Sequence, residues 1–189
     1  VGRTQDILAL MGELQRAGRL PRLNAYVDSP MASAATRITL RHTELPAVDR
    51  VRFTESVEDS MAINAVRAGA VIISASGMAT GGRVLHHLKQ LLPHARNTVL
   101  FAGFQAQGTR GRSLIEGASE VKIHGQWVPV NAHVARLNSM SAHADSTEIL
   151  RWLNGFTRPP GRLYLVHGEP SAMDAMKAQS YLHKYYSEL

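Results

Sequence analysis

The sequence predicts an α/β fold in which a mostly parallel sheet is flanked by helices. Short runs of β-branched residues alternate along the chain with segments whose apolar residues recur at helical spacing. The continuous apolar run over residues 71–73 is typical of a strand that is buried on both faces. A glycine-rich turn, a helix over residues 83–92 and a strand over residues 98–102 follow it. This order predicts a βαβ unit and therefore parallel strands.

The other elements of the first 115 residues rest on local signals. Ile7 and Met11 stand at helical spacing, and Pro30 suits the first turn of a helix. Ser56, with Asp59 three residues later, predicts a capped helix start. The expected helices are 4–16, 30–40, one that begins after Ser56, and 83–92, and the expected strands are 23–27, 71–73 and 98–102.

The pattern changes after about residue 116. Two short β-rich runs, 121–124 and 127–130, predict a hairpin with Gly125 and Gln126 as its turn. The elements expected after this hairpin are a strand over 133–138, a helix over 146–154 capped by Ser146, a strand over 163–166 and a helix over 171–186. We therefore predict a domain boundary near residue 116, between domains over 1–115 and 116–189.

Composition narrows the function classes. The chain has 189 residues, of which 44% are hydrophobic and 19% charged, and this balance is typical of a globular protein. The absence of cysteine excludes a disulfide scaffold, a zinc ribbon and a thiol nucleophile. A net charge of +6 favours phosphate-bearing partners. No apolar run approaches the ~20 residues of a membrane span, and no signal peptide opens the chain, so we expect a cytoplasmic protein with no membrane partner.

The first candidate site is the glycine-rich segment 74–83. It follows the buried strand and opens a helix, where glycines allow close approach of a ligand and free amides favour an anion. Gly77, Gly81 and Gly82 fit neither a P-loop nor a dinucleotide-binding pattern. A tight turn whose glycines serve packing alone remains the alternative.

Two histidines form the second candidate site. His143 and His167 each follow an expected strand, and ligands of open α/β sheets gather at the carboxyl ends of strands. One helix lies between the two positions, so adjacent strands would bring the imidazoles together. Ser141 shares a face with His143 if the segment is extended. A catalytic triad of Ser141, His143 and Asp145 is disfavoured, because such groups normally come from separated segments. Asp145 can also serve as a helix cap.

Five stretches, taken in order, resemble the β-CASP proteins of the metallo-β-lactamase superfamily, which are zinc-dependent RNA-processing nucleases. The stretches are Val-Gly-Arg-Thr-Gln at 1–5, Tyr-Val-Asp-Ser-Pro-Met-Ala at 26–32, Ser-Gly-Met at 76–78 with Gly-Gly-Arg at 81–83, Ser-Ala-His-Ala-Asp at 141–145, and Val-His-Gly-Glu at 166–169. Together they span nearly the whole chain.

The resemblance implies roles for individual residues. His143 would lie beside the scissile phosphate as a proton donor or phosphate contact, and His167 would be a ligand to one zinc of a two-zinc centre. Ser76, Gly77 and Ser141 would bind the RNA. Two zinc ions would activate a water molecule for hydrolysis of a phosphodiester.

One family signature is missing. The main metal motif, His-x-His-x-Asp-His, is absent from the sequence. The resemblance therefore implies a β-CASP domain over residues 1–115, followed by a partial metallo-β-lactamase αβ unit over 116–189. We expect the missing N-terminal half to be a partner and RNA to be the substrate. Alone, the chain is expected to bind no zinc tightly, to cleave nothing, and either to self-associate as a homo-oligomer or to keep a mobile tail, because its apolar surface would lack a cover.

Two other functions stay open at this point. A non-catalytic RNA-binding or scaffold protein of the same family would keep the fold without the metal ligands. A small α/β domain that binds a nucleotide or a sugar phosphate at residues 77–83 would also account for the glycine-rich turn.

Overall fold

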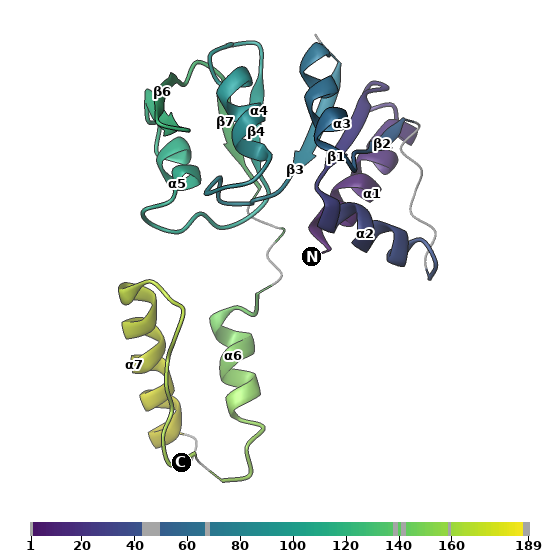
Figure 1. The fold of residues 1–189 in the computed structure, drawn as a ribbon. Helices are drawn as coiled ribbons and strands as arrows, with labels where there is room; N and C mark the ends of the chain where they lie inside the picture. Colours follow the sequence, from purple (N-terminus) through teal and green to yellow (C-terminus); the bar gives the residue numbers. More distant parts are fainter. Residues whose placement is uncertain are drawn as a thin grey trace. The chain divides into compact units, whose positions relative to one another are not determined.

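The computed structural model describes residues 2–42, 50–66, 69–137, 140, 143–158 and 160–186. The chain divides into two compact units, Val1–Met140 and Ser141–Leu189, which are described separately below (Figure 1).

The first unit holds most of the secondary structure. In chain order its elements are α1 (Arg3–Arg16), β1 (Asn24–Asp28), α2 (Pro30–Thr39), β2 (Val51–Phe53), α3 (Val57–Ala62), the 3₁₀ turn η1 (Ile63–Ala65), β3 (Ala70–Ser74), α4 (Val84–Leu91), β4 (Thr98–Phe101), α5 (Arg110–Ile115), β5 (Glu120–Ile123), β6 (Gln126–Pro129) and β7 (His133–Arg136).

A parallel sheet in the order β2-β1-β3 forms one half of this unit. Ala25 and Val27 of the central strand are fully buried and pack against Leu8 and Met11 of α1. All three strands run the same way, so their carboxyl ends meet at one edge of the sheet. The predicted α/β class with parallel strands and flanking helices is confirmed (Figure 1).

A second core lies around α4, and here the predicted βαβ unit is wrong in one respect. β4 pairs in parallel with β7 and not with β3. The reason lies in α4, whose Leu85 and Leu88 are buried with Phe101 and with residues of α5 and of the β5–β6 hairpin. The helix therefore leads the chain from the first core into a second one.

The β5–β6 hairpin turns one residue earlier than the sequence suggested. Ile123 pairs with Gln126, so His124 and Gly125 make the turn in place of Gly125 and Gln126. Both turn residues have positive φ, 47° and 78°, as a type I′ turn requires. Gly125 accepts this conformation without strain, and this fixes the register of the pair.

Several element boundaries also differ from the prediction. The short elements β2 and α5 were not expected from the sequence, and α5 begins at the cap Thr109. The predicted capping box of Ser56 and Asp59 is confirmed. At α6 (Ser146–Leu153), the cap is Asp145 and not Ser146, because the Asp145 carboxylate accepts the backbone N–H of Glu148 at 2.8 Å.

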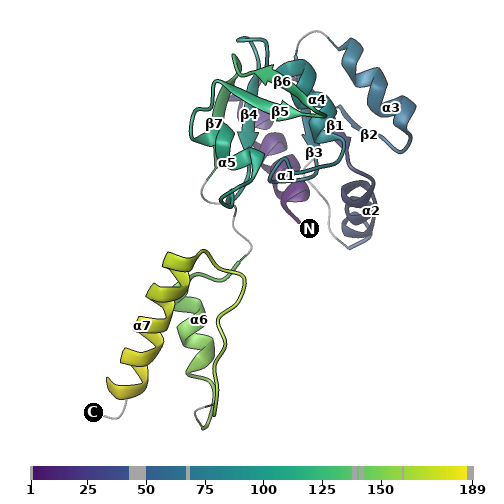
Figure 2. The ribbon, with the colours of Figure 1, turned by 60° about the vertical axis from the view of Figure 1, so that its left-hand side comes forward.

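The second unit contains α6 and α7 (Pro170–Tyr186), which lie side by side in both views (Figure 1, Figure 2). The strand expected over residues 163–166 is wrong: within the described part of the chain these residues belong to no sheet. A strand needs a neighbour to take its backbone hydrogen bonds, and none of the described strands pairs with it. Tyr164 and Val166 are accordingly 72% and 80% exposed. Among the described residues, no helix has the length and apolar character needed to cross a bilayer.

Candidate functional site

The glycine-rich segment forms a turn over residues 75–83, which we call the 75–83 turn, between β3 and α4. It leaves the sheet at the edge where the carboxyl ends of the parallel strands meet. This is the edge at which open α/β sheets bind their ligands. Gly77 and Thr80 are exposed, whereas Ala79 is fully buried, so one side of the turn faces solvent and the other faces the protein.

Both ends of the turn are held by one residue, Asp28, the last residue of β1. At the first end, Asp28 pairs with Ser74 in the sheet, and the Ser74 hydroxyl donates to the Asp28 carbonyl at 3.1 Å. At the second end, Arg83 Nη1 donates to the Asp28 carboxylate at 2.9 Å. Arg83 also donates to the Glu55 carbonyl at 3.0 Å, which ties the turn to the loop after β2.

The Asp28 carboxylate is fully buried and receives four side-chain hydrogen bonds. Its Oδ1 accepts from Thr54 at 2.5 Å and from Arg83, and its Oδ2 accepts from Ser60 at 2.6 Å and lies 2.6 Å from His87 Nε2. Burial raises the pKa of Asp28, but these four hydrogen bonds, led by that of Ser60, outweigh it and lower the pKa from 3.8 to about 2. Asp28 is therefore ionised at neutral pH.

The middle of the turn is held from behind by α5 and the loop before it. Gln105, which is 1% exposed, donates from Nε2 to the Gly77 carbonyl at 2.9 Å. The Gly111 amide donates to the Met78 carbonyl at 3.0 Å, and Arg110 donates to the Ala79 carbonyl. Three successive carbonyl groups of the turn are thus occupied by donors from the protein interior.

Several backbone amides of the turn have no acceptor among the described residues. Within the part of the chain that the structure describes, no acceptor takes a hydrogen bond from the backbone N–H of Gly77, Met78, Gly81 or Gly82. Beside them, the Ser76 and Thr80 hydroxyls lie 3.1 Å apart. Backbone amides without acceptors, next to hydroxyl groups and in a protein of net charge +6, suit an anion such as a phosphate.

Gly111 lets α5 approach the turn closely. A β-carbon at this position would lie 1.7 Å from Gln105 Oε1 and 3.0 Å from the Met78 carbonyl oxygen. We expect Gly111→Ala to lower the free energy of unfolding by about 1–3 kcal/mol, because Gln105 is buried and cannot move aside without breaking its own hydrogen bonds. Urea denaturation measures the loss. Gly77→Ala is the matched control, since its β-carbon meets no atom within 4 Å, and equal stability of the two variants would contradict this account.

The structure places the predicted site residues in both units. Ser76 and Gly77 belong to the first unit, as described above. His143 and His167 belong to the second unit, where both are exposed, and His167 has a φ of +65°. Ser141 lies outside the described residues. Because the strand expected before His167 is absent from the described structure, the geometric argument that joined the two histidines has no support.

The described residues do not fit a zinc centre by themselves. A two-zinc site needs several His, Asp or Glu ligands around each ion. In residues 2–42, 50–66, 69–137, 143–158 and 160–186, no group of three or more such side chains converges. The buried Asp28 carboxylate is already saturated by its four donors, so it is not a metal ligand either.

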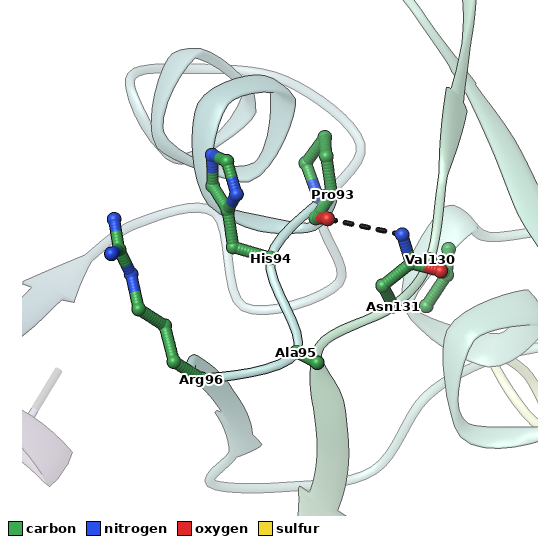
Figure 3. A pocket seen from close by; sticks show the side chains of 6 residues that line it. All are labelled: Pro93, His94, Ala95, Arg96, Val130 and Asn131. Atoms are coloured by element: carbon green, nitrogen blue, oxygen red, sulfur yellow. Dashed lines mark hydrogen bonds between the residues drawn. The ribbon is translucent and has the colours of Figure 1, made fainter.

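A surface hollow lies elsewhere, at the amino ends of β4 and β7 in the second core. It is lined by the loop before β4 and the residues before β7, and the Asn131 amide donates to the Pro93 carbonyl at 3.0 Å across it (Figure 3). His94 and Arg96 stand on its rim. None of the predicted site residues lines this hollow.

The fold and the turn geometry can now be compared with known proteins. Residues 4–114 match the family model of the Beta-Casp domain. The chain belongs to the β-CASP family. Residues 127–186 match a second family model, the Zn-dependent metallo-hydrolase RNA specificity domain. The resemblance to metallo-β-lactamase-fold nucleases that the five sequence stretches suggested is therefore confirmed.

Three relatives are similar to most of this chain. The chain is 35% identical to ribonuclease TTHA0252 of Thermus thermophilus over 93% of this chain and 43% of that protein. It is 29% identical to an RNase J-like protein of Methanocaldococcus jannaschii, over 89% of this chain and 41% of that protein. It is also 29% identical to the transcription termination factor FttA of Pyrococcus horikoshii, over 90% of this chain and 29% of that protein. The chain spans less than half the length of each, and the names support a family of RNA-processing nucleases.

Sequence reasoning missed the residues that support the turn. Asp28 appeared only within a resemblance stretch, Arg83 only as the last residue of the glycine-rich segment and of a resemblance stretch, and His87, Gln105 and Arg110 had no assigned role. For Asp28 a signal was available, because it is a polar residue directly after the apolar strand Ala25–Val27, the same strand-end position that singled out His143 and His167. Gln105 carries no such signal, since its contacts to Gly77 cross 28 positions of the chain.

Proposed function

We propose that this chain forms the RNA-contacting part of a zinc-dependent nuclease that hydrolyses RNA phosphodiester bonds in the cytoplasm. Family membership and the ribonuclease names of two relatives support the reaction class. The observation that carries the proposal is the 75–83 turn, whose carbonyls are occupied from behind while four of its amides have no acceptor among the described residues.

The residues have the following proposed roles. Ser76 and Gly77 bind the RNA backbone through the hydroxyl and the amide. His143 donates a proton or contacts the scissile phosphate, and Ser141 binds the RNA. His167 is one zinc ligand, and the other ligands come from protein beyond these 189 residues. Zinc, when bound in the complete site, supplies an activated water molecule.

The domain boundary near residue 116 belongs to this proposal. The first matched family model ends at residue 114 and the second begins at residue 127, which supports a boundary between them. Exposed apolar side chains of the second unit, among them Trp152 at 65% and Phe156 at 48%, support a C-terminal part that packs against protein outside this chain.

A negative charge introduced at Gly77 tests whether the 75–83 turn binds RNA. Gly77→Asp adds a carboxylate where a side chain meets no atom within 4 Å, so the fold is preserved while phosphate is repelled. We expect the 189-residue chain to bind a single-stranded RNA of about 15 nucleotides with an affinity that falls as salt rises. Gly77→Asp should weaken binding by at least about tenfold, which corresponds to ~1.4 kcal/mol. Fluorescence anisotropy with a labelled RNA measures both effects.

Two controls complete this experiment. Gly77→Ala adds a β-carbon without charge and should weaken binding less than Gly77→Asp does. Gly161→Asp makes the same charge change in open space outside the turn and should have little effect. Equal RNA affinity of the two aspartate variants would reject the turn as the RNA site. Stronger binding of a mononucleotide than of RNA would favour the nucleotide-binding alternative.

The proposal also covers catalysis. With zinc added, the 189-residue chain should leave the RNA intact, whereas a longer protein that contains it and the missing metal motif should cleave. Cleavage by the 189-residue chain alone would show that its own residues assemble a working site.

A further inference from the structure

Five polar side chains from four segments of the first unit meet in one buried cluster. Asp28 lies at its centre. Thr54 follows β2, Ser60 belongs to α3, and Arg83 and His87 lie at the start of α4 and one turn into it. Each carboxylate oxygen of Asp28 accepts hydrogen bonds from two of these groups, at distances of 2.5 to 2.9 Å. Asp28, Thr54, Ser60 and His87 are buried, whereas the Arg83 side chain is 22% exposed and forms the outer side of the cluster.

Packing alone does not require such a cluster. Taking ionised groups out of water carries a desolvation penalty, and apolar residues of similar volume often stabilise a fold as well. A buried network, by contrast, fixes the positions of its members, because each hydrogen bond depends on distance and angle.

The network holds the two ends of the 75–83 turn. Ser74, the residue before the turn, is tied to Asp28 by strand pairing and by its hydroxyl group. Arg83, the last residue of the turn, is tied to the Asp28 carboxylate and to the Glu55 carbonyl. Both ends of the turn are thus tied to one residue, the first to the Asp28 backbone and the second to its carboxylate. α4 is held on the same carboxylate a second time, through His87.

The conformation of the turn depends on this spacing. Gly82 has a φ of +76°, and a β-carbon there would lie 3.2 Å from the Ala75 carbonyl oxygen, so the two ends of the turn are in close contact. The Val84 amide donates to that same carbonyl at 3.3 Å. If Arg83 moves, the Gly81 and Gly82 amides move with it.

We propose that Asp28 is a positioning residue, which holds the 75–83 turn, through Arg83 and Ser74, in the conformation that presents its amides to an RNA phosphate. The inference rests on the proposed RNA-binding function of the turn. Asp28 itself is fully buried, and both of its carboxylate oxygens are occupied by donors of the protein. Its effect on RNA passes through the residues that it holds.

The variant Asp28→Asn separates this role from simple electrostatics. Asparagine keeps the shape but loses the negative charge and one of the two acceptor oxygens, so the charge-assisted hydrogen bond that holds Arg83 is weakened. The substitution removes a negative charge from a basic chain, and electrostatics alone would therefore strengthen RNA binding. Loss of positioning predicts the opposite sign. We expect binding to weaken by about tenfold, measured below the unfolding temperature of the variant.

A second measurement follows the turn without RNA. The amide chemical shifts and hydrogen-exchange rates of residues 76–82 should change in Asp28→Asn. Thr36→Val is the matched control, because it removes another buried hydroxyl, 2.6 Å from the Gln5 side chain, away from the turn. In this control both the turn amides and the RNA affinity should stay as they are.

Arg83→Lys provides the same test if Asp28→Asn fails to fold. Lysine keeps the positive charge but loses the forked contact to Asp28 and Glu55. Unchanged turn amides in the folded variants, or unchanged or tighter RNA binding, overturns the positioning role. Absence of RNA binding by the unaltered chain overturns the proposed function instead, and the amide measurement then still decides whether Asp28 holds the turn.

Discussion

Asp28→Ala is expected to lower the free energy of unfolding by about 3–5 kcal/mol. Alanine removes the common partner of Arg83 and His87 and leaves buried donors without an acceptor. The Thr54 and Ser60 hydroxyls lose their bonds to the carboxylate as well. The cost is therefore the desolvation of several unpaired groups, not the loss of one contact. Urea denaturation of the two chains measures it.

Glu13→Ala serves as the control for this experiment. Glu13 is an exposed acidic residue of α1, and its removal should change stability by no more than about 0.5 kcal/mol. The pair Asp28→Ala and Arg83→Met adds a second criterion. Since part of the penalty comes from Arg83 losing its carboxylate partner, the double variant should lose less stability than the sum of the single variants. A loss below about 1 kcal/mol for Asp28→Ala would contradict the account of the cluster.

The fold was predictable where the signal is local. The capping box of Ser56 and Asp59 and the apolar strand over residues 71–73 involve neighbouring residues only, and both are present in the structure. The partner of β4 was not predictable in this way. It depends on whether the apolar face of α4 covers the first sheet or joins Phe101 and the hairpin, and that choice involves residues distant in sequence.

The candidate site shows the same difference between local signals and contacts that are distant in sequence. Gly77 and Gly82 are visible as a turn in the sequence because glycine tolerates the backbone that such a turn needs. The residues that support the turn are not visible in the sequence. Asp28 and Arg83 are 55 positions apart, and they meet through the parallel pairing of β1 and β3. For His143 and His167, the argument required a strand over residues 163–166, and none of the described strands gives it a partner.

Acid should weaken the first unit through Asp28. Its pKa is lowered from 3.8 to about 2 in the folded chain, so the folded state holds a proton on this group less readily than the unfolded state. The stabilisation is fully present above about pH 4 and is lost as the pH falls toward 2, because the unfolded chain is protonated first. The shift corresponds to about 2 kcal/mol.

Comparison with Asp28→Asn isolates this contribution from that of the other acidic residues. Urea denaturation of both chains at several values between pH 6 and pH 2 gives two stability profiles. The difference between them should be largest and constant above about pH 4 and should shrink steadily below it, as the carboxyl group of the unaltered chain takes up its proton. A difference that stays constant down to pH 2 would mean that Asp28 is not the ionised centre of the cluster. The position of Arg83, and with it the conformation of the turn, would then have to be stabilised by other contacts.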